Sequence, residues 1–148
     1  MDHPIIMIAD ALAQWLKARQ FSQPVTVARR AVVQFDLKDL KTVQVSVVPA
    51  DWESQVLTRV SDKLGFQIDV AVQQKLGTSD LAASDTLMGL VWEIEQAIKR
   101  LRLETTPPAQ WTKVEKIPGC EPGFAAEHLG QEYRTFTSVR RHTFVLQG

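Results

Sequence analysis

The strongest constraint on the fold is the two-residue alternation of FQIDVAVQ, residues 66–73. Apolar side chains fall on one side of an extended chain and polar side chains on the other: Phe66, Ile68, Val70 and Val72 against Gln67, Asp69 and Gln73. This period is typical of a strand with one face on a core. The segment is the clearest strand of the chain.

Two other segments carry apolar residues at three- and four-residue steps, which is typical of amphipathic helices. The first begins near Asp2 and Pro4, continues to about Arg19, and ends before Pro24. Its predicted buried stripe is Ile5, Ile8, Leu12, Trp15 and Leu16. The second follows the turn GTSD at 77–80, ends in the basic run KRLR, and has the stripe Leu87, Val91, Ile94, Ile98 and Leu101.

Further strands are predicted on both sides of these segments. Residues 25–35 are rich in β-branched side chains, and 43–48 alternate; a polar turn between them predicts a hairpin-like pair that Pro49 closes. Residues 50–63 fit either a strand extension or a mobile loop. Residues 111–130 have the composition of turns with one short element, and 133–146 read as a final strand.

This order of elements predicts the α+β class, with a mainly antiparallel or mixed sheet flanked by two main helices. We expect a single domain over residues 1–148. A chain of 148 residues can bury roughly two-thirds of its unfolded surface without disulfides or metal. The single cysteine, Cys120, cannot form an internal disulfide.

Charge argues against a general affinity for nucleic acid or an anionic membrane, because 17 Lys and Arg balance 17 Asp and Glu. The pairs Arg29-Arg30 and Arg140-Arg141 lie in predicted strands, where neighbouring side chains point to opposite faces, so neither pair forms one patch. No segment reaches the ~20 apolar residues that span a bilayer. We expect no membrane and no sequence-specific nucleic-acid partner.

Candidates for chemistry are few. Cys120, Glu127 and His128 share a Pro/Gly-rich segment and are the types that a Cys/His hydrolase would use, but their spacing matches no such family. The other reading makes Cys120 a small, partly buried filler. His3, His128 and His142 lie far apart and form no metal-binding pair, and we expect His142 to be exposed. We predict no enzyme activity, no metal and no cofactor.

The four tryptophans, Trp15, Trp52, Trp92 and Trp111, are many for this length. Trp52 and Trp111 fall in loop-like segments outside the periodic core, where each could serve an interface or pack under its own loop. Trp92 lies beside Val91 on the second helix. It could broaden the buried stripe or mark a second contact face.

Several long strings resemble a known family. The run FSQPVTVARRAVVQFDLKDLKTVQVSVVP, the strand IDVAVQQKL, the helix LMGLVWEIEQAIKRLRL and the ending FTSVRRHTFVL are similar to the small tail terminator and neck (head-tail joining) proteins of tailed bacteriophages. The match covers most of the chain in order of elements, and it rests on structural strings without a catalytic signature.

The resemblance implies a virion protein that is made in the cytoplasm of the bacterial host. Such proteins form a homohexameric ring on the last ring of tail-tube subunits, end tube polymerisation and join the tail to the head-side connector. Subunits can be monomeric until a tube end presents a template. The implied partners are therefore further copies of the chain, the tail-tube protein and the connector or neck protein.

Exposure and charge, rather than a family motif, select the residues that we expect at contacts with subunits or partners. They lie in the mixed segment and on the last strand: Asp51, Trp52, Glu53, Arg59, Asp62, Lys63, Arg140 and Arg141. Three other readings stay open. They are a head-completion or adaptor protein of the phage neck, the Cys120 and His128 hydrolase, and a cellular adaptor that docks a partner on a sheet edge or helix.

Overall fold

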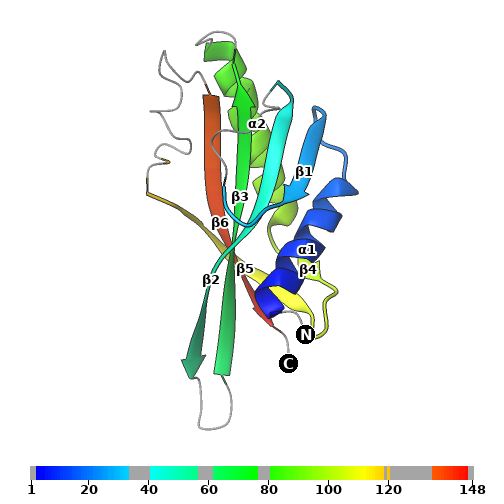
Figure 1. Cartoon of the computed structure of the whole chain (residues 1–148), viewed down its shortest axis with the longest axis vertical. Coiled ribbons are helices and arrows are strands. Elements are labelled where there is room, and N and C mark those ends of the chain that lie inside the picture. Colours follow the sequence, from blue (N-terminus) through cyan, green and yellow to red (C-terminus); the bar gives the residue numbers. More distant parts are fainter. Residues whose placement is uncertain are drawn as a thin grey trace.

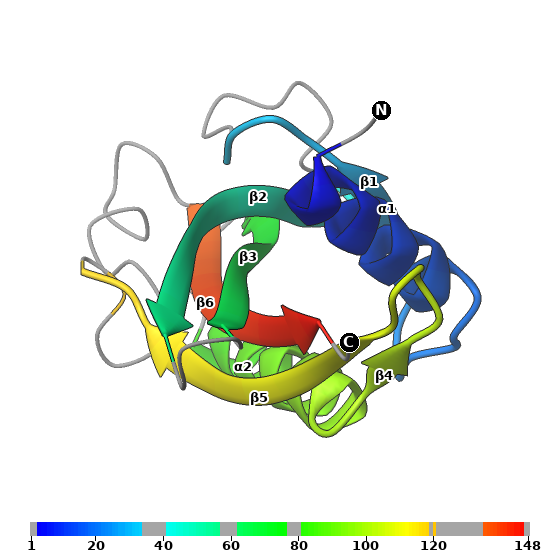
Figure 2. The same cartoon turned by 90° about the horizontal axis from the view of Figure 1, so that it is seen from below.

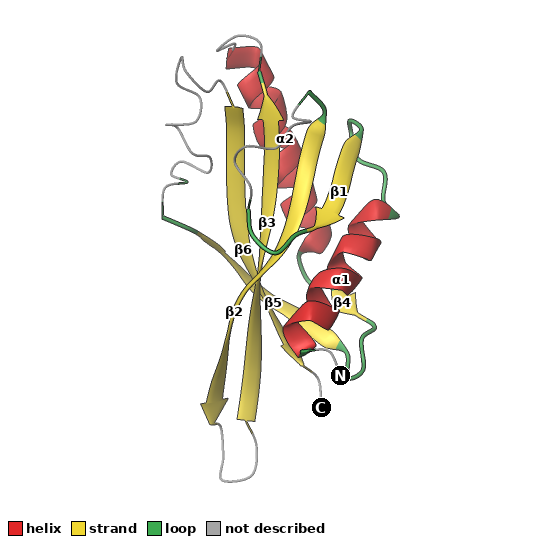
Figure 3. Cartoon of the chain, in the orientation of Figure 1, coloured by secondary structure: helices red, strands yellow, loops and turns green. Residues whose placement is uncertain are grey.

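The computed structural model describes residues 3–33, 41–56, 62–76, 81–118, 120 and 135–146, with the side chains at 54–56, 62–64, 81 and 82 left out of the description. In chain order the elements are α1 (Pro4–Lys17), β1 (Val25–Arg29), β2 (Val43–Val56), β3 (Asp62–Lys75), α2 (Leu81–Ile98), β4 (Arg102–Leu103), β5 (Ala109–Lys116) and β6 (Thr135–Leu146). Figures 1 and 3 show two helices against one curled sheet.

Helix α1 has the predicted amphipathic pattern. Its buried stripe is Ile5, Ile8, Ala9, Leu12, Ala13 and Leu16, and Trp15 packs at the margin of the core. Pro4 occupies the first turn, where a missing N–H costs no helical hydrogen bond. The N-cap is His3, whose Nδ1 accepts a hydrogen bond from the backbone N–H of Ile5. Asp2, which also suggested a helix start, lies outside the described residues.

Helix α2 buries the predicted positions Leu87, Val91, Ile94 and Ile98, together with Leu90. It ends at Ile98 because Arg100 adopts a φ of 66°, in the left-handed region that terminates many helices. Leu101, the last position of the predicted stripe, therefore lies beyond the helix, where it packs against the core from the side.

The six strands form one mixed sheet in the order β1-β2-β3-β6-β5-β4. Among the described strands, only β1 and β2 form a parallel pair, from Val25 opposite Val43 to Arg29 opposite Val47. The predicted hairpin between these strands is thus wrong, and β1 ends at Arg29 rather than near residue 35. Period-two alternation fixes the face on which a side chain lies but not the direction of the strand.

Pro49 does not end β2 as predicted, because on the side to which its backbone points no described strand pairs with it. The carbonyl of Val47 accepts from the N–H of Arg30 on the β1 side. Alternate residues of a strand direct their backbone groups to the same side, so the backbone of Pro49 also points to the β1 side. Pro49 therefore removes no N–H from the pairing with β3. The register shifts between Pro49 and Asp51, and β2 continues to Val56.

The mixed segment 50–63 is a strand extension where the structure describes it. Pairing of β2 with β3 continues to Val56 opposite Asp62, whereas β6 pairs with β3 only as far as Gly65. We call residues 51–56 and 62–66 the arm. In Figure 1 the arm extends from the lower end of the sheet, well past the neighbouring strands.

Strand β5 was not predicted as such, since 111–130 looked like turns with one short element. Ala109 and Trp111 pair with Leu146 and Phe144 of β6, and a register shift between Trp111 and Lys113 then moves Val114 onto the same face. The shift breaks the alternation by one residue, which hides the strand in the sequence. The predicted final strand is confirmed from Thr135 to Leu146, and its first two predicted residues, 133 and 134, lie outside the described residues.

Both helices cover one face of the sheet and enclose one core with the apolar side chains of β3, including Ile68, Val70 and Val72. Helix α1 lies against β1 and β2, and α2 against β6 (Figure 2). The predicted α+β class and the mixed sheet with two helices are confirmed. Within the described ranges, neither helix is long and apolar enough to cross a membrane.

Candidate interaction surface

The arm brings together most of the residues predicted at contacts. Asp51, Trp52 and Glu53 follow one another on β2 and are all exposed. Asp62 and Lys63 lie on β3, opposite Val56 and Gln55, so the backbone places them on the same hairpin. Their side chains, and the whole of Arg59, lie outside the described part of the chain. Arg140 and Arg141 are on β6, in the body of the sheet.

Trp52 is the contact between the arm and α1. Its ring centroid lies 4.6 Å from that of His3, and the planes are tilted by 51°. The His3 ring also lies edge-on to Phe66, 6.4 Å between centroids. His3 therefore caps α1 with its Nδ1 atom, and its ring contacts Trp52 and Phe66 of the arm. Even so, 54% of Trp52 is exposed, so much of the indole faces solvent.

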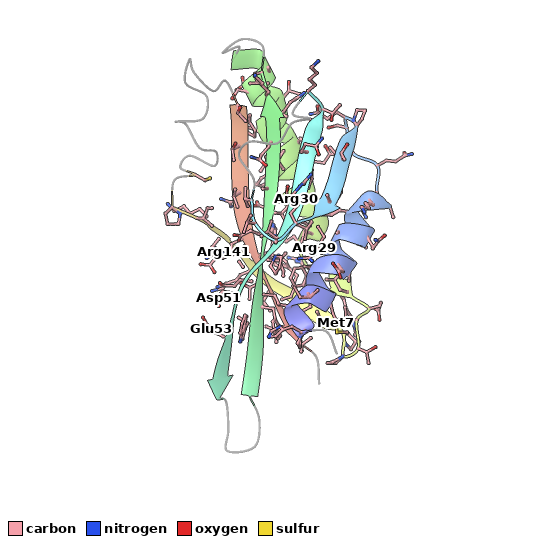
Figure 4. All side chains as sticks on the ribbon, in the orientation of Figure 1. Met7, Arg29, Arg30, Asp51, Glu53 and Arg141 are labelled. Carbon is pink, nitrogen blue, oxygen red and sulfur yellow. The ribbon has the colours of Figure 1, made fainter. Side chains whose placement is uncertain are left out.

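Charged side chains gather where the arm joins the rest of the sheet, on the face that no helix covers, which we call the helix-free face. Arg141 donates to Asp69 through Nε (2.9 Å to Oδ1) and Nη2 (3.2 Å to Oδ2). This hydrogen bond raises the pKa of Arg141; burial opposes the rise, and the charges of Asp69, Glu115 and Asp51 add to it. Figure 4 shows Asp51, Glu53 and Arg141 along the same side of the molecule. Asp51 also accepts from the Trp52 N–H at 2.8 Å.

The prediction that the arginine pairs split between faces is confirmed. Arg140 turns to the helix side and binds Glu95 of α2 at 2.8 Å, whereas Arg141 binds Asp69 on the other face. Likewise Arg29 binds Asp10 of α1 at 3.1 Å, and Arg30 donates to Ser46 and Gln44. Both arginines of β6 that we expected at contacts therefore already hold partners within the chain.

An open pocket of about 350 Å³ separates the arm from β5 on the helix-free face. Its lining comes from four strands: Glu53 of β2, Gly65 and Gln67 of β3, Thr143 and Val145 of β6, and Thr112 and Lys113 of β5. Lys113 is exposed and lies 3.4 Å from Glu115. The pocket gives the molecule a concave, polar surface beside the arm.

His142 is buried, not exposed as predicted; only 1% of it is accessible. It lies on the inner strand β6 between Ile68 of β3 and Val114 of β5, under the helices. Its Nδ1 accepts from Nε1 of Trp111 at 3.0 Å. Burial, and to a smaller extent the charge of Arg140, lowers the pKa of His142 to about 4, so the ring is neutral at pH 7.

Trp111 is part of strand β5 and packs partly buried against the core, which corrects its placement outside the core. Trp92 is 63% exposed on α2, so it does not broaden the buried stripe. Cys120 is buried beside Ala71 and Val139, as a small filler residue would be. Its proposed partners Glu127 and His128 lie outside the described residues, so the Cys/His hydrolase stays a prediction.

Sequence reasoning missed two contributors to this surface. His3 gave no signal, because a histidine is not a favoured N-cap and the aromatic contact joins it to a residue far along the chain. Lys113 was hidden with the rest of β5. Comparison with protein-family models gave no match, and a search of curated protein sequences found no significant match.

Proposed function

We propose that this chain is a structural subunit of a tailed-bacteriophage virion. It forms a homohexameric ring at the head-proximal end of the tail tube, ends polymerisation of the tube and joins the tail to the head-side connector. The sequence resemblance supplies this class. The observation that carries it in the structure is the arm, which extends past the sheet with exposed Asp51, Trp52 and Glu53.

The physical reason is that an isolated two-stranded hairpin is only marginally stable in water. A strand edge without a neighbour also presents unpaired backbone groups that favour pairing with another chain. An arm of this kind is therefore best explained by a surface that it meets in an assembly. In a ring, each weak contact becomes effective because several contacts form together.

Electron microscopy of particles from a deletion of this gene, in the genome that encodes it, tests the proposal. We expect overlong tails without heads, because tube polymerisation would lose its stop, and normal tails when the gene is restored in trans. Free tails of normal length beside empty heads would instead move the protein to the head side of the neck. Infectious particles of unaltered structure would contradict any virion role.

A further inference from the structure

Helix α2 has an exposed face with Trp92 at its centre. The side chain of Trp92 is 63% exposed, more than any other large apolar side chain that the structure describes. Asp85 and Lys99 lie seven residues before and seven residues after it. The helical hydrogen bonding reaches Lys99, whose N–H donates to the carbonyl of Glu95 at 3.0 Å. Because two turns of an α-helix take about 7.2 residues, Asp85, Trp92 and Lys99 project in nearly the same direction. We call this row the outer stripe of α2.

The surface beside Trp92 has room for another chain. Gly89 lies one turn before Trp92 on the same side of the helix, and it is exposed. A side chain added at Gly89 would meet no atom within 4 Å at its Cβ. The outer stripe therefore has a large aromatic ring next to a position without a side chain, which allows a second helix to pack closely.

The two ends of the outer stripe carry opposite charge. Asp85 and Lys99 are both exposed, and within the described residues neither takes part in an ion pair. Glu95, which also lies near this face, is already bound to Arg140 at 2.8 Å. Asp85 and Lys99 are therefore the charges that the outer stripe offers to a partner.

The spacing makes the outer stripe complementary to a copy of itself. When two α2 helices pack antiparallel with Trp92 of each at the centre, Asp85 of each chain lies opposite Lys99 of the partner subunit. The reason is that both positions are equally far from Trp92. Parallel packing would instead place like charges opposite each other. Antiparallel packing relates two copies by a two-fold axis, and a contact of this kind joins the same surface of both subunits.

We propose that the outer stripe of α2 binds the outer stripe of a second copy of this chain in antiparallel orientation. The two Trp92 side chains meet at the two-fold axis, where Gly89 of each chain leaves room for them. Asp85 pairs with Lys99 of the partner subunit at both ends. The pairing goes beyond the ring role and does not rest on it, because a two-fold contact closes with two copies. A cyclic ring of six instead needs a contact between two different surfaces.

Sedimentation equilibrium of the full chain over a range of concentrations tests the pairing. We expect a reversible equilibrium between one and two copies. Trp92→Gln should raise its dissociation constant at least about tenfold, because a buried tryptophan at the centre of an interface contributes much of the binding free energy. Trp52→Gln is the matched control, because it removes the exposed tryptophan of the arm, and it should leave the constant unchanged. Circular dichroism checks that both variants fold. A chain that stays monomeric at all concentrations, or equal constants for the two variants, would overturn the inference.

Charge exchange tests the orientation of the two helices. Asp85→Lys and Lys99→Asp should each weaken the pairing roughly fivefold, because each places like charges opposite each other at both ends. The chain with both changes should recover the native dissociation constant, since the facing charges are again opposite. Asp51→Lys, at an exposed carboxylate of the arm, is the control and should leave the constant unchanged. No loss in the single variants, or no recovery in the double variant, would contradict the antiparallel pair.

Discussion

At the scale of single residues, polar side chains join elements that lie far apart in the sequence. Arg140 binds Glu95 of α2, Arg141 binds Asp69 of β3, and His142 accepts from Trp111 of β5. Three consecutive residues of β6 thus hold a helix and both neighbouring strands. The alternation of faces was predictable for the arginines, but the burial of His142 was not, because it depends on β5, which the sequence hides.

His142 predicts a specific dependence of stability on pH. Its pKa is about 4 in the folded chain and about 6.5 when unfolded, so between these values the unfolded chain binds more protons. The free energy of unfolding should therefore fall by about 3 kcal/mol as the pH drops from 6.5 to 4. Urea denaturation at several pH values measures this loss.

His142→Gln is the control for that measurement, because its side-chain oxygen can still accept from Trp111 but does not titrate. The carboxylates titrate in both proteins, so the difference between the two curves isolates His142. We expect the difference to grow as the pH falls from 6.5 to 4 and to stay constant above 6.5. A difference that does not vary with pH would contradict the buried, neutral imidazole.

At the scale of elements, the sequence predicts the helices and strands whose hydrophobic periodicity is uninterrupted. Helices α1 and α2 and strands β3 and β6 follow the pattern to within a few residues at the ends that the structure describes. The errors occur where tertiary structure overrides the local signal. Pro49 is tolerated because no described strand pairs with β2 on the side to which its backbone points. Strand β5 keeps Val114 on the covered face only through a register shift.

His3 links two elements, the start of α1 and the arm, and two substitutions separate the contributions of the two links. His3→Ala should lower the free energy of unfolding by about 1 kcal/mol for the lost N-cap and by about 0.5 kcal/mol more for the ring contact with Trp52. His3→Asn keeps a capping oxygen and should lose only the smaller amount. Equal stability of all three proteins in urea would show that neither link contributes.

At the scale of the molecule, the chain is a helix-covered sheet with an arm that carries exposed Asp51, Trp52 and Glu53. The sequence located part of this surface, since Asp51, Trp52 and Glu53 were selected from exposure and charge alone. It could not reveal the parallel β1, the strand order or the pairing of β5 with β6. These depend on pairings between distant segments, which a local pattern does not encode.

The distal part of the arm, residues 54–64, can be removed without loss of a core residue that the structure describes. The pair of Glu53 and Gly65, which face each other on β2 and β3, can flank a two-residue Asn-Gly turn. The chain in which Asn-Gly replaces residues 54–64 should therefore fold, with the circular dichroism of the native protein. It should fail in assembly, because the distal part of the arm is gone.

The most direct test of the proposed role of the arm measures tail length in the gene deletion. The deletion is complemented either with the native gene or with this shortened gene. Electron microscopy should show tails of normal length with the native gene. With the shortened gene, although its product is folded and present at equal amounts, it should show overlong tails. Tails of normal length with the shortened gene would contradict the claim that the arm makes this chain a ring subunit that ends the tail tube.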